Sequence, residues 1–288
     1  PFVSSNVVAL ALSGSPHKEM IAGLLDGTAI ASWCFSEASP VDELDSLRLE
    51  ITPDGDHVLL HGVKRPVESA DQASHLLVTG RTGQGLSQVL VATSTPGITL
   101  SPMRGVDLTR RYSVVRFDQV RVPASAVLGQ LGEAQAMVEK QLQHALVLLT
   151  AEAVGAMQAA FDMTVEWAFD RYSFGRPLAS YQALKHRFAN MATWLQASHA
   201  ISDEAARAVH DGRPEAAELV SAAKSYIGDH GSELVQECVQ LHGGIGVTYE
   251  HDLHLFLRRV TLARALLGTP AAHRRRMARL VAHKELAQ

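Results

Sequence analysis

The sequence predicts an α+β protein with a small antiparallel β domain followed by a C-terminal four-helix bundle. Residues 30–122 hold short segments rich in β-branched or alternating residues, separated by Gly, Pro, Asp and Ser. After Pro123, longer segments rich in helix formers repeat apolar residues at intervals of three and four. A short helix that ends at Gly27 precedes both regions. The chain therefore divides into residues 1–28, 29–125 and 126–288.

The individual elements follow from the same patterns. Six strands are expected between the turn residues, at Ile30–Glu37, Leu47–Ile51, His57–Val63, His75–Thr79, Gln88–Thr93 and Tyr112–Val122. Four helices are expected after them, at Gly132–Asp170, Tyr181–Asp211, Pro214–Leu241 and Glu250–Leu267. Long helices joined by short loops pack as antiparallel neighbours, which is the arrangement of a four-helix bundle.

Composition and charge bound the class of protein. Of the 288 residues, 47% are hydrophobic, which is enough for one large core or two modest ones. The net charge of -4 gives no reason to expect a nucleic acid partner. Cys34 and Cys238 lie far apart, in a predicted strand and a predicted helix, as expected of buried reduced thiols.

The sequence carries no evident targeting segment. No apolar run approaches the roughly 20 residues needed to span a bilayer, and the first residues lack the parts of a signal peptide. We therefore expect a cytoplasmic protein without a membrane partner. Because the chain begins at Pro1 rather than Met, we also expect residues upstream of it.

One segment with binding chemistry is Arg-Tyr-Ser-Phe-Gly-Arg-Pro at residues 171–177, where the first long helix ends. The planar guanidinium of Arg171 can bind a phosphate through two hydrogen bonds, and the Phe174 ring can stack on a base. Gln182 then opens the next helix. The alternative is a plain loop with a solvated arginine.

A second segment is Gln-Leu-His-Gly-Gly-Ile-Gly-Val-Thr at residues 240–248. It places three glycines within four positions directly after a helix, so another molecule can approach the backbone and its N–H groups closely. A helix C-cap requires only one glycine. A tight connection between two helices remains the alternative.

Together and in this order, the two segments resemble the acyl-CoA dehydrogenase family. The resemblance implies a middle β domain and a C-terminal four-helix domain, with residues 1–28 as a remnant of an N-terminal helical domain that is largely absent. It also implies contacts to the adenosine diphosphate half of an FAD bound to the neighbouring subunit. By resemblance, the cofactor-binding residues are Arg171, Phe174, Leu178, Gln182, Gln240, Gly243 and Gly244.

The chain departs from the family where active members hold the flavin ring. Val41 and Asp42 stand at the Gly and Ser of the family's T-E-P-x-x-G-S-D segment, Pro66 stands at its flavin-covering Trp, and Glu68 at the following Ser or Thr. Proline offers neither a ring to stack nor an N–H, and a carboxylate repels an electron-rich reduced flavin. The chain's own isoalloxazine site is therefore predicted to be lost.

The catalytic base is also missing. The family removes the α-proton of the thioester with a Glu at one of two positions, which by resemblance are Leu267 and Ala145 here. Neither side chain accepts a proton, so we assign no catalytic residue. The resemblance then implies a non-catalytic subunit that shares FAD with a homologous, Glu-bearing partner, as in the α2β2 steroid-CoA dehydrogenases of actinobacteria. It further implies an acyl-CoA substrate and electron-transfer flavoprotein as the acceptor.

Two alternatives remain. A homotetrameric dehydrogenase or oxidase with a displaced base would use Glu250 or Asp252, or Glu139 or Glu152 if the register slips. A DNA-binding member of the fold would use the basic cluster formed by Arg258, Arg259 and residues 273–276. His251 and His254 beside Asp252 are more typical of a packed or solvated helix face than of a metal site, and we predict no metal.

Overall fold

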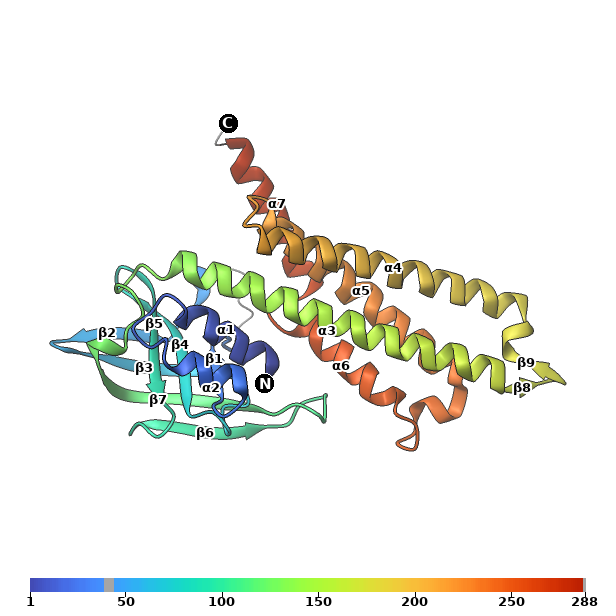
Figure 1. The fold of residues 1–288 in the computed structure, drawn as a ribbon, viewed down its shortest axis with the longest axis horizontal. Coiled ribbons are helices and arrows are strands. Elements are labelled where there is room, and N and C mark those ends of the chain that lie inside the picture. Colours follow the sequence, from blue (N-terminus) through green and yellow to red (C-terminus); the bar gives the residue numbers. More distant parts are fainter. Residues whose placement is uncertain (39–43, 287–288) are drawn as a thin grey trace. The chain divides into compact units, whose positions relative to one another are not determined.

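The computed structural model describes residues 1–38 and 44–286 and has the predicted α+β fold (Figure 1). Two compact units can be separated. The first, called the sheet unit, contains Pro1–Gly105 and Arg110–Ala145. The second, called the helical unit, contains Val106–Thr109 and Leu146–Gln288.

The sheet unit begins with two short helices, α1 (Phe2–Leu12) and α2 (Met20–Asp26). The sequence predicted only the short helix that ends at Gly27, so α1 is an addition to the prediction. The end of α2 agrees with the prediction, because Gly27 follows it with a φ of 78°, a left-handed conformation that glycine adopts without a steric penalty. Packing against β1 buries one face of α1.

The sheet is built from strands of four to twelve residues, all within the described part of the chain. They are β1 (Ala31–Cys34), β2 (Glu50–Asp54), β3 (His57–Glu68), β4 (His75–Thr82), β5 (Gly85–Ala92), β6 (Ile98–Met103) and β7 (Tyr112–Pro123). The order is β1-β4-β2-β3-β7-β6, and β5 pairs with β4. Its core includes Leu60, Leu76, Val89 and Phe117.

The sheet differs from the predicted antiparallel domain in two pairings. β1 and β2 each run parallel to β4, whereas the pairs β2–β3, β3–β7, β4–β5 and β6–β7 are antiparallel. A parallel pair requires a crossover connection, and the chain provides one through β2 and β3 before it returns to β4 beside β1. Strand periodicity alone does not reveal such a crossover.

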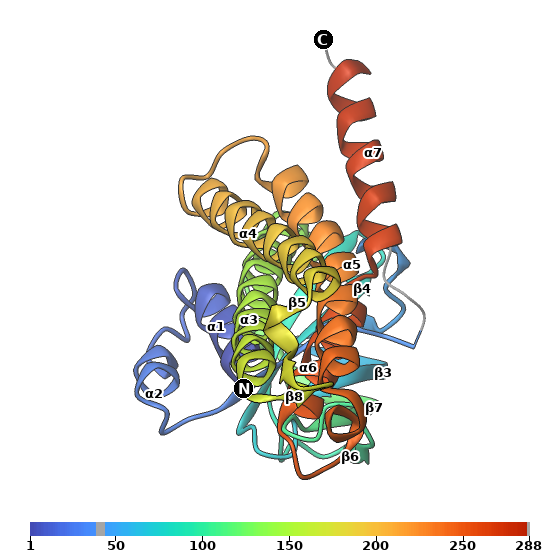
Figure 2. The ribbon, with the colours of Figure 1, turned by 90° about the vertical axis from the view of Figure 1, so that its right-hand side faces the viewer.

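The helical unit is a bundle around α5 (Figure 2). Its helices are the continuation of α3 (Gln135–Asp170), then α4 (Gln182–His210), α5 (Ala216–His242), α6 (Leu253–Ala265) and α7 (Pro270–Leu286). α5 packs against α4, α6 and α7. A Cβ at Gly231 would lie 2.9 Å from the Met157 sulfur, so glycine at this position permits the close approach of α3 and α5.

Two expectations from composition can be compared with the fold. Cys34 on β1 and Cys238 on α5 are buried free thiols, as predicted, and burial raises the pKa of each to about 12. Contrary to expectation, α3 contains one stretch long and apolar enough to cross a membrane. Half of that stretch is buried inside the protein, which is the environment of a core helix.

Candidate functional site

The end of α3 leads into a small hairpin of β8 (Tyr172–Ser173) and β9 (Arg176–Pro177). Its two-residue turn begins with Phe174, and both turn residues have positive φ, 51° and 81°. This backbone geometry matches the twist of antiparallel strands. The Tyr181 hydroxyl donates to the last carbonyl of β8 at 2.6 Å, which ties the hairpin to the start of α4.

Phe174 is held in an unfavourable conformation without any packing gain in this chain. A left-handed φ costs a residue with a Cβ about 1–2 kcal/mol, and the Phe174 side chain is 97% exposed. Strained residues that make no contact of their own are typical of binding sites, where another molecule supplies the missing contact. The hairpin therefore presents an aromatic ring to a molecule outside this chain.

The glycine turn follows α5 as the short helix η4 (Gly243–Val247). Gly243 has a φ of 67° and a ψ of -140°, which only glycine adopts readily. Gly244 is different, because its φ is not positive and a Cβ there would meet nothing within 4 Å. The fold itself does not require glycine at position 244, and its exposed backbone is open to a second molecule.

Two aromatic rings join these segments inside the helical unit. Trp167, one turn before Arg171 on α3, stacks on His242 at the end of α5, with ring centroids 5.3 Å apart and an interplanar angle of 17°. The Arg171 guanidinium carbon lies 5.8 Å from the Trp167 ring centroid. The structure thus brings the predicted phosphate-binding arginine and the glycine turn to the same end of the bundle.

The other predicted cofactor contacts lie around this centre. The Leu178 N–H donates to the Arg171 carbonyl at 2.8 Å. Gln182 is the first residue of α4 and is exposed. Gln240 is exposed on the last turn of α5, and its carbonyl accepts the N–H of Gly243. All seven residues belong to the helical unit, and their assignment to FAD remains a prediction.

The sequence motifs do not include Trp167, and they contain His242 only as a member of the glycine turn. A signal for Trp167 was present, because a residue four positions before Arg171 lies on the same face of the helix. The contact between the two rings joins helices that are distant in sequence, so periodicity gave no sign of it.

Exposed apolar side chains lie near both segments. On the α3 end and β8 they are Phe169 and Tyr172, and on the glycine turn and the loop after it they are Ile245, Val247 and Tyr249. A soluble domain rarely exposes so many large apolar side chains unless another molecule covers them.

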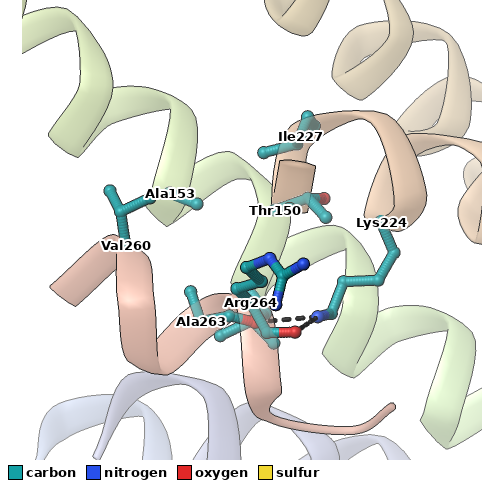
Figure 3. A pocket seen from close by; sticks show the side chains of 9 residues that line it. Thr150, Ala153, Lys224, Ile227, Val260, Ala263 and Arg264 are labelled. Atoms are coloured by element: carbon teal, nitrogen blue, oxygen red, sulfur yellow. Dashed lines mark hydrogen bonds between the residues drawn. The ribbon is translucent and has the colours of Figure 1, made fainter. Parts of the chain in front are cut away.

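A small pocket of the helical unit offers no free base (Figure 3). The pocket is open to solvent on one side, and it is lined mainly by apolar side chains of α3, α5 and α6. The lysine in its wall, Lys224, donates to the carbonyls of Ala263, Arg264 and Gly268 at 2.8–2.9 Å. These are carbonyls of the last turn of α6 and the segment after it, so Lys224 caps the helix.

Resemblance places the family base at Ala145 or Leu267, and two of the carboxylates considered as displaced bases accept hydrogen bonds from other side chains. Ala145 is fully buried, and Leu267 has a left-handed φ of 55°. Glu152 accepts a hydrogen bond from the Arg259 guanidinium. Glu250 is exposed, and a hydrogen bond from Thr248 lowers the pKa of its carboxyl.

In the sheet unit, the carboxylate predicted to repel a flavin is already paired. Glu68 lies 3.1 Å from Arg110, and both side chains are largely buried. Glu37 forms a second buried pair with Lys64 at 2.7 Å. Val41 and Asp42, the other predicted departures, lie outside the described residues.

The basic cluster proposed for DNA is largely occupied by contacts within the helical unit. Arg258 donates to the Val106 carbonyl and the Tyr249 hydroxyl, both at 3.2 Å. Arg274 donates to Asp229 at 2.7 Å. Across residues 1–38 and 44–286, no three His, Cys, Asp or Glu side chains are grouped to hold a metal ion.

Comparison with known proteins identifies the family. A family model described as "Acyl-CoA dehydrogenase, C-terminal domain" matches residues 133–282, more than half of the chain. Probable acyl-CoA dehydrogenase FadE25 of Mycobacterium tuberculosis is 27% identical over 94% of this chain and 72% of that protein. The chain belongs to the acyl-CoA dehydrogenase family.

Solved structures agree with this assignment. The steroid ACAD Tcur3481-Tcur3483, a G363A variant, matches with a TM-score of 0.90 and 26% identity, covering 99% of this chain and 77% of that one. A glutaryl-CoA dehydrogenase from Mycobacterium smegmatis in complex with FADH2 has the same fold, with a TM-score of 0.86 and 24% identity over 97% and 74% of the two chains.

Proposed function

We propose that this chain is a subunit of an FAD-dependent acyl-CoA dehydrogenase that lacks a catalytic carboxylate and contributes FAD contacts to a homologous, Glu-bearing partner. The observation that carries the proposal is Phe174, whose ring is 97% exposed on a left-handed turn. A chain that serves only its own fold gains nothing from this conformation. Contact with a cofactor held by another subunit explains why Phe174 is exposed on this turn.

The helical unit fits the adenosine diphosphate half of FAD. Arg171 supplies a cation for the pyrophosphate, and the open turn at Gly243 and Gly244 supplies backbone N–H groups. Phe174 supplies a ring that can stack on adenine. When bound, FAD would supply the hydride acceptor for the β-carbon of the acyl-CoA, while a carboxylate removes the α-proton. The residues of this chain hold and orient the cofactor without taking part in that proton transfer.

The sheet unit does not fit a flavin ring. Pro66 has no N–H to donate, and the Glu68 carboxylate is committed to Arg110. With Ala145 and Leu267 at the base positions, a ring site in this chain would have no proton acceptor at either place. The partner must therefore provide both the ring site and the base.

The identity of the substrate class and partners rests on resemblance. The steroid ACAD that matches with a TM-score of 0.90 is named for two gene products, which supports a heterotetramer of two unlike chains and a steroid side-chain CoA as the acyl-CoA. Electron-transfer flavoprotein is then the expected electron acceptor, and the cytoplasm the expected compartment.

Co-expression tests the proposal. The chain is produced alone and together with a homologous chain that has Glu at the position of Leu267 or Ala145. We expect the single chain to be colourless and inactive, and the complex to hold one FAD per pair of unlike chains. A single chain that binds FAD fully and oxidises acyl-CoA would overturn the proposal.

A further inference from the structure

The stacked rings of Trp167 and His242 bury two polar nitrogen atoms, which apolar side chains in the same place would not do. The Trp167 Nε1 atom and the His242 Nε2 atom are buried, and neither has a hydrogen-bond partner among the described residues. Buried polar atoms without partners destabilise a fold. Two apolar side chains at these positions would fill the space without that penalty.

The protonation of His242 follows from its neighbours. Its Nδ1 atom lies 2.8 Å from the Cys238 carbonyl, so Nδ1 carries the proton and donates it, and Nε2 is left as an acceptor. Burial lowers the pKa of His242 and favours the neutral ring. His251 packs its edge against the same ring, with centroids 4.6 Å apart. The ring is thus fixed on three sides.

The position of the pair in the chain explains why it is kept. Trp167 lies one helical turn before Arg171, and His242 directly precedes Gly243. The two groups proposed to hold the FAD pyrophosphate therefore sit on either side of one ring contact. Any change in the distance between the rings changes the distance between the guanidinium and the glycine turn.

We propose that Trp167 and His242 are positioning residues, whose stacking fixes the separation between the Arg171 guanidinium and the N–H groups of the glycine turn. The proposal rests on the proposed function, because it concerns how this chain holds a partner's FAD. Neither ring is assigned a contact with FAD.

The test measures FAD dissociation from the complex with its catalytic partner, using Trp167→Leu and Trp167→Phe. We expect Trp167→Leu to weaken FAD binding about five- to tenfold, the effect of losing one aromatic pair. Trp167→Phe keeps an aromatic ring and should restore most of the affinity. Trp194→Leu is the matched control, because Trp194 stacks on His230 in the same unit at 5.6 Å without joining the two segments.

The positioning role makes a distinct prediction for His242. His242→Phe keeps the stack and removes the unpaired nitrogen, so FAD affinity should stay within about twofold of wild type. His242→Leu removes the stack and should weaken binding as Trp167→Leu does, and it replaces that variant if the latter does not fold. Equal FAD affinities for the Leu and Phe variants at either position would overturn the proposal.

The two proposals fail in different ways. If Arg171→Ala weakens FAD binding and Trp167→Leu does not, the positioning role is wrong and the cofactor contact stands. If Arg171→Ala and Phe174→Ala both leave FAD binding unchanged, the proposed function is wrong. If Trp194→Leu weakens binding as much as Trp167→Leu does, a general loss of stability explains both, and the positioning role is again overturned.

Discussion

The Arg259 guanidinium donates to the Asp107 carboxylate, a side chain that is only 1% exposed. Asp107 also accepts the N–H and the hydroxyl of Thr109, at 2.9 and 2.7 Å. Burial alone would raise the pKa of Asp107, but the hydrogen bonds from Arg259 and Thr109 outweigh it and hold the pKa below its ordinary value. The same guanidinium donates to Glu152, which removes that carboxylate from the set of displaced bases.

Removing Arg259 should leave a buried charge without its partner. We expect Arg259→Gln to lower the free energy of unfolding by about 3–5 kcal/mol, measured by urea denaturation. Adding Asp107→Asn to that variant should recover part of the loss, because the buried charge is then gone. Arg207→Gln is a control, since Arg207 is exposed and its ion pair with Glu204 is 3.8 Å long. If the loss of stability in the double variant equals the sum of the losses in Arg259→Gln and Asp107→Asn, the two side chains are not coupled.

Lys224 should make stability depend on pH. Burial lowers its pKa from 10.5 to about 7 in the folded chain. Between these values the unfolded chain binds more protons than the folded one, so the free energy of unfolding rises as pH rises from about 7 toward 10. The slope is at most about 1.4 kcal/mol per pH unit, and the three carbonyl acceptors, which favour the ammonium form, reduce it.

Urea denaturation of wild type and Lys224→Met at pH 6.5, 8 and 9.5 checks this dependence. The stability of wild type relative to the variant should increase with pH, because methionine has no proton to lose. A constant difference across the three pH values would show that Lys224 keeps an ordinary pKa despite its burial.

The sequence predicted best those elements in which apolar residues recur at a regular spacing. The four expected helices match α3 to α6 to within three residues at their ends, whereas α7 (Pro270–Leu286) was not predicted. The strand β6 was missed, since Ile98–Met103 pairs only with β7 at the edge of the sheet and none of its residues is fully buried. The hairpin at Phe174 was also missed, because strands of two residues have no measurable period.

The sequence motifs predicted the residues of the candidate site but not their arrangement in space. Arg171 and Gly243 were identified from their residue types, but nothing in the pattern placed them together. The two segments meet at the stacked rings of Trp167 and His242, which form a tertiary contact between helix ends. Likewise, Glu68 could be recognised as a departure from the family, while its pairing with Arg110 required the fold.

Arg171→Ala should lower FAD occupancy of the complex. A guanidinium that binds a phosphate through charge-assisted hydrogen bonds contributes about 1.5–3 kcal/mol, or roughly ten- to a hundredfold in affinity. FAD-to-protein absorbance ratios after gel filtration measure the loss. Arg207→Ala, an exposed arginine on α4, should keep full occupancy. Unchanged occupancy in Arg171→Ala would contradict the cofactor contact.

Phe174→Gly should separate stability from binding. Glycine adopts the left-handed turn without a Cβ penalty, so the chain alone should become about 1 kcal/mol more stable. The same change removes the exposed ring, so the complex should bind FAD more weakly. Thermal unfolding of the chain and FAD titration of the complex measure the two effects. A loss of stability in the chain alone would show that the ring packs within this subunit.

Leu267→Glu tests whether the missing base alone makes the chain inactive. Leu267 is partly exposed, so a glutamate at this position can remain solvated. Ala145 is fully buried, and a glutamate there would be a buried charge without a partner. The variant has a carboxylate at that position, but Pro66 and the Glu68–Arg110 pair remain where, by resemblance, family members hold the flavin ring. We therefore expect no acyl-CoA oxidation by this variant expressed alone, measured by reduction of an artificial electron acceptor. Turnover would mean that the sheet unit binds a flavin ring despite those residues, and that one lost carboxylate separates this chain from an independent enzyme.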